Sequence, residues 1–503
     1  MFGAGEVSVY SEGGVIRRIL ATATHEAPEG TTRIDARGCT LLPGFADTHC
    51  HPFELGWLKR NVDLRGTINL EGLRSRVSTA VRKARKGEWV VGMGWDHEAF
   101  PDRRLPARWD IDGVSPDNPV AIRRVCGHIT LLNGKAIEAL GIEGRIGSEY
   151  DIDPRGALTG IVRERAQEEA LARIPGRSAK QCLDDLYSVE FEAARFGLTT
   201  LHCVLSTDSY KEELEALAAR AEAGTPAPRY RAYVPPEAVE FLRLTRLGER
   251  LGGEKVRVNG VKIYCDGSLG ARTAALREPY SDDPSNSGLL RYGDEELGEL
   301  VKRADAAGYQ VIVHAIGDRA IEQALRALST VAGGGNPRRH RIEHASLLPA
   351  DLRTGLRKLN IGVTIQPCFV VSDAWAELRL GGERVRDLYP FKSMVQEGIV
   401  VSGSSDAPVE TLSAIIGIWA ALDRGGSTPR ERLSLAEAMD LYTGNAAFNG
   451  LDEGATGLRE GSRADFTLLD SNVEGMHPAM LRKVRTAATV VAGEVVYSFE
   501  GGA

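Results

Sequence analysis

Short apolar runs alternate with amphipathic, helix-like segments between about residues 185 and 405. Segments such as YKEELEALAARAEAG (210–224) and DEELGELVKRADAAG (294–308) end at glycine, a common signal for the end of a helix. This alternation predicts parallel strands joined by helical crossovers. With LLPGFADTH (41–49) the predicted strands number eight, which is the number that closes a (β/α)8 barrel. The other apolar runs are TTLHCV (199–204), YRAYV (230–234), NGVKIYCDG (259–267), QVIVHAIGD (310–318), HRIEHAS (340–346), IGVTIQPC (361–368) and IVVSGSSDAP (399–408).

Two features depart from a plain barrel. Roughly 150 residues separate the first predicted strand from the second, although a βα unit needs only about 30. We expect an insertion at about 65–185 with strands of its own, at WVVGMGWD (89–96) and NPVAIRRVCGH (118–128). Both ends of the chain also contain short strand patterns around turns. The predicted fold class is therefore α/β: a TIM barrel over 44–446 with that insertion, and a small β-sandwich built from 1–43 and 447–503.

Composition excludes several classes of function. A formal net charge of −7 over 503 residues argues against nucleic acid as a partner, because phosphate binding requires a basic face. The longest uncharged apolar stretch, LSAIIGIWAAL (412–422), is too short to span a bilayer, and the first residues do not resemble a signal peptide. The seven cysteines contain no C-x-x-C spacing, which argues against a disulfide framework or a cysteine zinc site. We expect a cytoplasmic protein that acts on a small molecule and does not bind a membrane.

Two histidines stand one residue apart where the first barrel strand should end. His49 and His51 leave a strand on the same face, and active sites of barrels lie at the carboxyl ends of the strands. Two converging imidazoles can bind one metal ion. A pair of histidines that only form hydrogen bonds at a strand end is an equally reasonable interpretation of this motif alone.

Further ligand-type residues end other predicted strands. His314 ends QVIVH, His344 ends HRIEH, and Asp406 follows IVVSGSS. Each by itself is more often a hydrogen-bonded polar group than a ligand, but their coincidence at the same kind of position favours a metal centre. Lys262 lies inside the apolar run NGVKIYCDG, where burial would lower its pKa and make the amine nucleophilic. Such a lysine can react with carbon dioxide to form a carbamate that bridges two metal ions.

The sequence resembles the amidohydrolase superfamily, in the branch (amidohydrolase family 3) that includes YtcJ-like hydrolases and N-substituted formamide deformylases. The resemblance runs through LLPGFADTHCHP, GMGWDHEAFPDRRLPARWDID, SPDNPVAIRRVCGHITLLNGKAI, GVKIYCDGSLGARTAAL, VIVHAIGDRAI, RIEHASL, SGSSDAPV, TGNAAF and GLREGSRADFTLLD. His-x-His after a Pro-Gly-Phe strand and the DGSLGARTAAL loop are its most specific parts. One departure is Ala446, which stands where the family usually has proline.

The resemblance implies a ligand set. His49 and His51 would hold one metal ion, His314 and His344 a second, with carboxylated Lys262 between them and Asp406 completing the site. Zinc is the expected ion. If Lys262 is not modified, a single metal ion is the better interpretation. A barrel with a β-sandwich from both termini and a homodimer are also family-level expectations.

The resemblance also implies residues that face the substrate. His128 is a candidate to stabilise the developing oxyanion. Trp95, Asp96 and His97 match substrate-facing positions in the insertion, although packing is an equal alternative for Trp95 and Asp96. His202 ends a strand and is a candidate substrate contact.

The predicted activity is metal-dependent hydrolysis of a carbon–nitrogen bond other than a peptide bond, an amide or N-substituted formamide, with Asp406 as the proton shuttle. Hydrolysis of an ester, lactone or cyclic amide is an alternative. Deamination is another, but VIVHAIGD lacks the glutamate that deaminases of the superfamily place near this histidine. A barrel without activity that serves for binding should have lost ligand positions, and all of them are intact here.

Overall fold

The computed structural model of the chain describes residues 5, 7–21, 30–124, 129–147, 149–452 and 457–499. It divides into two compact units, one made of Met1–Pro52 with Leu186–Ala503 and the other of Phe53–Asp185. In the described ranges every helix is too short or too polar to cross a membrane.

The first unit contains an eight-stranded parallel sheet that is nearly closed into a barrel, which confirms the predicted (β/α)8 class. Each strand is almost wholly buried, as the continuous apolar runs predict. The first and last strands meet through side-chain and main-chain bonds: Thr48 Oγ1 donates to the Gly403 carbonyl over 2.9 Å, and the Asp406 N–H donates to the His49 carbonyl over 2.8 Å. In order around the sheet the strands are β4 (Phe45–Cys50), β11 (Leu198–Val204), β12 (Arg229–Val234), β13 (Val256–Tyr264), β14 (Gln310–Ala315), β15 (Arg341–His344), β16 (Gly362–Ile365) and β17 (Val401–Gly403).

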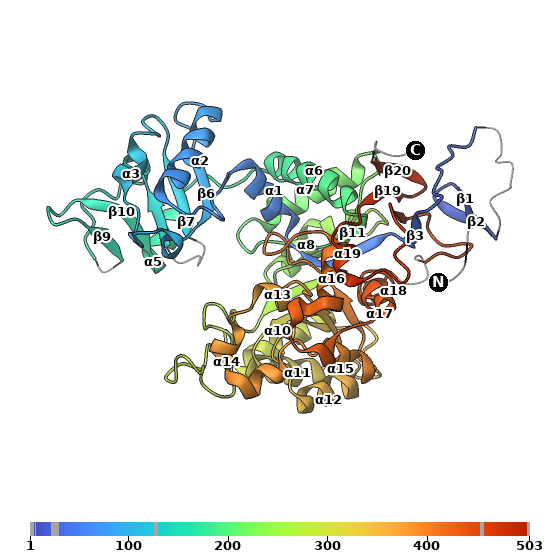
Figure 1. The fold of residues 1–503 in the computed structure, drawn as a ribbon. Coiled ribbons are helices and arrows are strands. Elements are labelled where there is room, and N and C mark those ends of the chain that lie inside the picture. The colour runs from blue at the N-terminus through green and yellow to red at the C-terminus, as the bar shows by residue number, and fades with distance from the viewer. Residues whose placement is uncertain are drawn as a thin grey trace. The chain divides into compact units, whose positions relative to one another are not determined.

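Helices follow the barrel strands. Helices α10 and α11 pack against β14, and α15 packs against β17. Figure 1 shows α10, α11 and α12 grouped together, and α10 packs on α11 and α11 on α12. The helical stretches 210–224 and 294–308 predicted from the sequence correspond to α7 and α10. The helices of this part are α7 (Tyr210–Glu222), α8 (Ala238–Thr245), α9 (Leu247–Arg250), α10 (Asp294–Ala306), α11 (Asp318–Ser329), α12 (Ala350–Leu359), α13 (Phe369–Ser372), α14 (Ala376–Arg384), α15 (Phe391–Gln396), α16 (Ala414–Asp423), α17 (Leu435–Asp440) and α18 (Gly444–Asn449). Helix α6 (Ala179–Arg195) precedes β11 and spans the boundary between the units.

Both ends of the chain contribute to the same small β region (Figure 1). The antiparallel order β20–β19–β18–β3 joins β3 (Thr40–Pro43) to β18 (Phe466–Leu469), β19 (Thr486–Val491) and β20 (Glu494–Ser498). The hairpin of β1 (Ser8–Glu12) and β2 (Val15–Leu20) packs on it through a shared apolar cluster that contains Ile16, Phe466 and Val490. The short helix α19 (Pro478–Leu481) lies between β18 and β19.

The second unit has its own mixed sheet, of order β5–β6–β7–β8–β10–β9. Its strands β6 and β7 form where WVVGMGWD and NPVAIRR predict them. The strands are β5 (Val62–Asp63), β6 (Val90–Trp95), β7 (Val120–Arg124), β8 (Ile129–Leu132), β9 (Tyr150–Ile152) and β10 (Leu158–Arg163), and the helices are α1 (Pro52–Arg60), which begins at the unit boundary, α2 (Leu70–Lys83), α3 (Arg108–Asp112), α4 (Gly134–Leu140) and α5 (Glu164–Leu171). The sequence-based domain limits at 43, 65, 185 and 447 stay a prediction.

Candidate metal centre

The ligand-type side chains lie at the carboxyl ends of the barrel strands. His49 belongs to β4, His314 to β14, and His344 is the last residue of β15. The backbone turns sharply at two of these ends, since His344 and Asp406 have φ values of +70° and +55°. Such left-handed conformations are uncommon for residues other than glycine and concentrate at functional sites. Here both residues depart from the backbone conformation of a regular strand.

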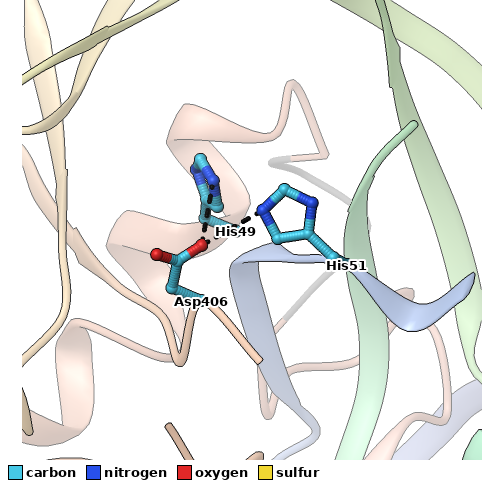
Figure 2. Close-up of side chains that lie close together, drawn as sticks. All are labelled: His49, His51 and Asp406. Atoms are coloured by element: carbon cyan, nitrogen blue, oxygen red, sulfur yellow. Dashed lines mark hydrogen bonds and ion pairs between the residues drawn. The ribbon is translucent and has the colours of Figure 1, made fainter. Parts of the chain in front are cut away.

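His49, His51 and Asp406 form a compact group of donor atoms that all lie within 4.8 Å of one another. Figure 2 shows both imidazoles directed at the same carboxylate oxygen. Asp406 Oδ1 is 3.2 Å from His51 Nε2 and 3.4 Å from His49 Nε2. Two imidazole nitrogens and a carboxylate are ligands that a divalent transition metal ion such as zinc accepts. The donor set therefore fits one cation.

Two further histidines and a lysine adjoin this group. The ring centroids of His314 and His344 are 4.5 Å apart, and that of His344 is 5.1 Å from that of His49. Lys262 Nζ lies 3.1 Å from His49 Nε2. Its carbon chain rises from β13 inside the barrel, and its ammonium lies over the Tyr264 ring at 4.8 Å. The four imidazoles, Lys262 and Asp406 are thus gathered in a single cluster, in which His51 and His314 are partly exposed and the other members are buried.

Burial sets the charges in the cluster. It lowers the pKa of His49 to about 4 and that of His344 to about 3, so both imidazoles are neutral and can offer a lone pair. It also lowers the pKa of Lys262 to about 8. Burial alone would raise the pKa of Asp406, but the hydrogen bond with His51 and the neighbouring imidazoles hold it well below its usual range. Neutral imidazoles beside an ionised carboxylate are the protonation states that metal binding requires.

The comparison with known proteins decides the family. A model described as the amidohydrolase family matches residues 32–497. The chain belongs to the amidohydrolase family. It is 33% identical to a Bacillus subtilis (strain 168) protein named as the amidohydrolase YtcJ, over 97% of this chain and 96% of that one. It is 25% identical to the N-substituted formamide deformylase of Arthrobacter pascens, over 93% of this chain and 90% of the relative.

A solved structure gives the same result. An uncharacterized metal-dependent hydrolase from Pyrococcus furiosus is 35% identical, with a TM-score of 0.74 over 87% of this chain and 89% of that one. The resemblance drawn from the motifs is confirmed, and this amidohydrolase is a hydrolase that acts on carbon–nitrogen bonds.

The structure does not bring all predicted site residues of this amidohydrolase together. His202 is buried with its ring 5.8 Å from that of Tyr233, and it lines a cavity of about 600 Å³ beside the amino ends of β4 and β11. Trp95 is buried in the apolar core of the second unit, where Nε1 donates to the Ile122 carbonyl over 2.9 Å. The contacts found for these two residues are packing contacts, and their predicted role in substrate binding stays a prediction.

The remaining predicted substrate contacts also lie in the second unit or outside the described residues. Asp96 pairs with Arg124 Nη2, and Arg124 Nε donates to His97 Nδ1 over 3.2 Å. His128 lies outside the described residues. The predicted substrate-binding and oxyanion roles of these residues stay predictions.

Sequence reasoning missed several polar side chains that contact the histidines. Gln366, directly after β16, accepts from His344 Nδ1 over 2.7 Å through Oε1. Asp266, two residues after β13, has Oδ1 3.4 Å from His314 Nε2, and Glu343 bonds to His49 Nδ1. Each is a polar residue in or just after a buried strand, the same signal that pointed to the histidines. Their partners could not be assigned from spacing, because each contact joins different strands.

Proposed function

We propose that this amidohydrolase hydrolyses an amide bond of a small molecule, with an N-substituted formamide as the most specific candidate. The observation that supports this is the group of His49, His51 and Asp406, whose donor atoms lie within 4.8 Å of one another at the carboxyl ends of the barrel strands. A relative over nearly the full chain is named as an N-substituted formamide deformylase.

The residues have distinct roles in this proposal. His49 and His51 would hold a divalent cation, for which zinc is our candidate, and His314 with His344 would hold a second where one binds. A bound cation of this kind lowers the pKa of a water molecule and polarises a carbonyl oxygen. Asp406 is ionised and accepts the proton of the attacking water through Oδ1 or Oδ2. It then returns that proton to the departing nitrogen, which leaves poorly as an anion.

Lys262 is proposed to be carboxylated and to bridge the two cations. It is buried, its pKa is lowered to about 8, and it lies 3.1 Å from His49 Nε2. A substantial fraction of neutral amine near neutral pH allows attack on carbon dioxide. Lys262→Ala should lose bound metal and activity, and added short-chain carboxylates should restore part of both. A crystal structure of the metal-loaded protein in which the Lys262 amine is unmodified and one metal ion is bound would contradict the bridging role.

The test of the reaction combines one substitution with a substrate screen. Protein purified without chelator is assayed for metal content and for hydrolysis of formyl, acetyl and larger acyl amides of benzylamine-like amines, with matched esters and cyclic amides. Asp406→Asn should keep the remaining ligands but lower turnover of amides by about 10²–10⁴-fold, as loss of acid–base catalysis does. Asp184→Asn on the exposed face of α6 is the matched control and should remain fully active.

Two outcomes would contradict the proposal. Full activity of the metal-free protein would show that the reaction does not require a metal ion. Hydrolysis confined to esters or lactones, with Asp406→Asn nearly as active as the parent, would favour the ester alternative, because an alkoxide leaves without the proton that an amine requires.

A further inference from the structure

Strand β15 carries two buried charges beside the proposed metal centre. Arg341 and Glu343 are each 0% exposed, and Arg341 Nε donates to Glu343 Oε1 over 2.7 Å. Alternate residues of a strand share one face, so both side chains enter the barrel interior. A buried ion pair by itself contributes little to stability, because its desolvation offsets the attraction. The pair therefore calls for an explanation other than stability.

Arg341 is fixed by groups on other elements. Its Nη1 donates to Tyr233 Oη on β12 over 2.9 Å and to the Asn449 carbonyl at the end of α18 over 2.8 Å. Its Nη2 donates to the Thr48 carbonyl on β4 over 3.0 Å. The planar guanidinium thus has one orientation in which all these bonds form. It connects β15 to the residue that directly precedes His49.

Glu343 links the fixed guanidinium of Arg341 to the imidazole of His49. One carboxylate oxygen, Oε1, accepts from Arg341, and the other, Oε2, is bonded to His49 Nδ1. A carboxylate only accepts hydrogen bonds, so Nδ1 carries the proton and Nε2 keeps its lone pair. The same Nε2 lies 3.4 Å from Asp406 Oδ1 and 3.1 Å from Lys262 Nζ. The nitrogen without a proton is the one that faces the other candidate ligands.

We propose that Glu343, held by Arg341, is a positioning residue that selects the tautomer and ring orientation in which His49 offers Nε2 to the metal ion. Arg341 is connected to His49 in two ways. It bonds to the carbonyl of the preceding residue, Thr48, and it bonds to Glu343, which contacts the imidazole. The inference rests on the proposed metal-dependent function, but it concerns a property of the protein that exists before any metal binds. Carboxylates that orient ligating histidines raise metal affinity by about 10–100-fold.

The experiment measures metal affinity and tautomer separately from turnover. Glu343→Gln is nearly isosteric, but one amide cannot accept from both Arg341 Nε and His49 Nδ1, because its nitrogen only donates. Zinc competition against a chelator should give a Kd about 10–100-fold higher than in the parent protein. Glu299→Gln, on the exposed face of α10, is the matched control and should leave Kd unchanged.

Nitrogen-15 NMR of the histidine rings in the metal-free protein reads the tautomer directly. The parent protein should show His49 protonated at Nδ1, and Glu343→Gln should lose or shift that signal. If Glu343→Gln does not fold, Arg341→Lys serves in its place, since an ammonium cannot make all of the bonds of the guanidinium, and its Kd should rise as well.

Either of two results would overturn the inference. One is a Kd within threefold of the parent value in a folded Glu343→Gln or Arg341→Lys protein. The other is a parent His49 protonated at Nε2. These results can be distinguished from failure of the proposed function. If the protein binds no zinc, NMR of the metal-free protein still shows which tautomer His49 adopts.

Discussion

Asp266 gives a prediction whose magnitude follows from the contacts of its carboxylate. The side chain is buried, and its two oxygens accept three main-chain N–H groups. Oδ2 accepts from Ala275 and from Gly317, each over 2.9 Å, and Oδ1 accepts from Ile316 over 3.1 Å. The carboxylate therefore joins the loop after β13 to the loop after β14, directly beside His314. We predict that Asp266→Asn loosens both loops.

The loss of stability in Asp266→Asn comes from one hydrogen-bond donor, the main-chain N–H of Ile316. The single carbonyl oxygen of asparagine can take the place of Oδ2 and keep the bonds from Ala275 and Gly317. Its amide nitrogen then faces the Ile316 N–H, and a donor opposite a donor leaves that buried group without an acceptor. An unsatisfied buried donor costs about 1–3 kcal/mol. Because 1.4 kcal/mol is a factor of ten, local opening should become about 5- to 150-fold more frequent.

Hydrogen exchange followed by mass spectrometry measures this opening where it occurs. Peptides that cover 266–276 and 312–318 should exchange faster by that factor in Asp266→Asn, whereas peptides from β11 and β12 should not change. Asp294→Asn, at an exposed position at the start of α10, is the control and should leave these two loops at the parent rate. Parent-like exchange of both loops in a folded Asp266→Asn protein would show that the three bonds do not hold the loops together.

Two further predictions concern stability. Burial raises the pKa of Asp373 to about 6, and Tyr389 Oη donates a hydrogen bond to its carboxylate. The folded protein therefore binds the carboxyl proton of Asp373 more tightly than the unfolded chain does. The contribution of Asp373 to the free energy of unfolding should fall by about 1–3 kcal/mol as the pH rises from about 4 through 6. Asp373→Asn should remove this component, so a difference in unfolding free energy between parent and variant that is the same at pH 4 and pH 8 would contradict it. In Gly417→Ala the new Cβ would lie 1.9 Å from Tyr442 Oη, and we expect a loss of about 1–3 kcal/mol in thermal unfolding. Gly298→Ala, where a Cβ meets nothing within 4 Å, should instead stabilise α10 by about 0.5–1 kcal/mol, and equal effects of the two glycine substitutions would refute the packing argument.

Local patterns were sufficient to predict the barrel and the ends of its strands. A buried parallel strand is a short apolar run, and an amphipathic helix has a different period, so both can be read from neighbouring residues. The carboxyl ends of parallel strands open on one face, which made His49, His314, His344 and Asp406 candidates for one site before any contact was known. Family membership was predicted in the same way, from motifs that are continuous in the sequence, and is confirmed.

The contacts between strands were decided only by the tertiary structure. Glu343 lies 294 residues from His49, and Arg341 lies 293 residues from Thr48, so no local period relates them. Nothing in HRIEH distinguishes a glutamate that bonds to a histidine of β4 from one that faces solvent. The tilt of the strands and their order around the barrel set which side chains meet in its interior, and these depend on the packing of all eight strands at once. Residue types and positions along each strand are local properties, whereas the partner of a buried charge is a property of the closed barrel.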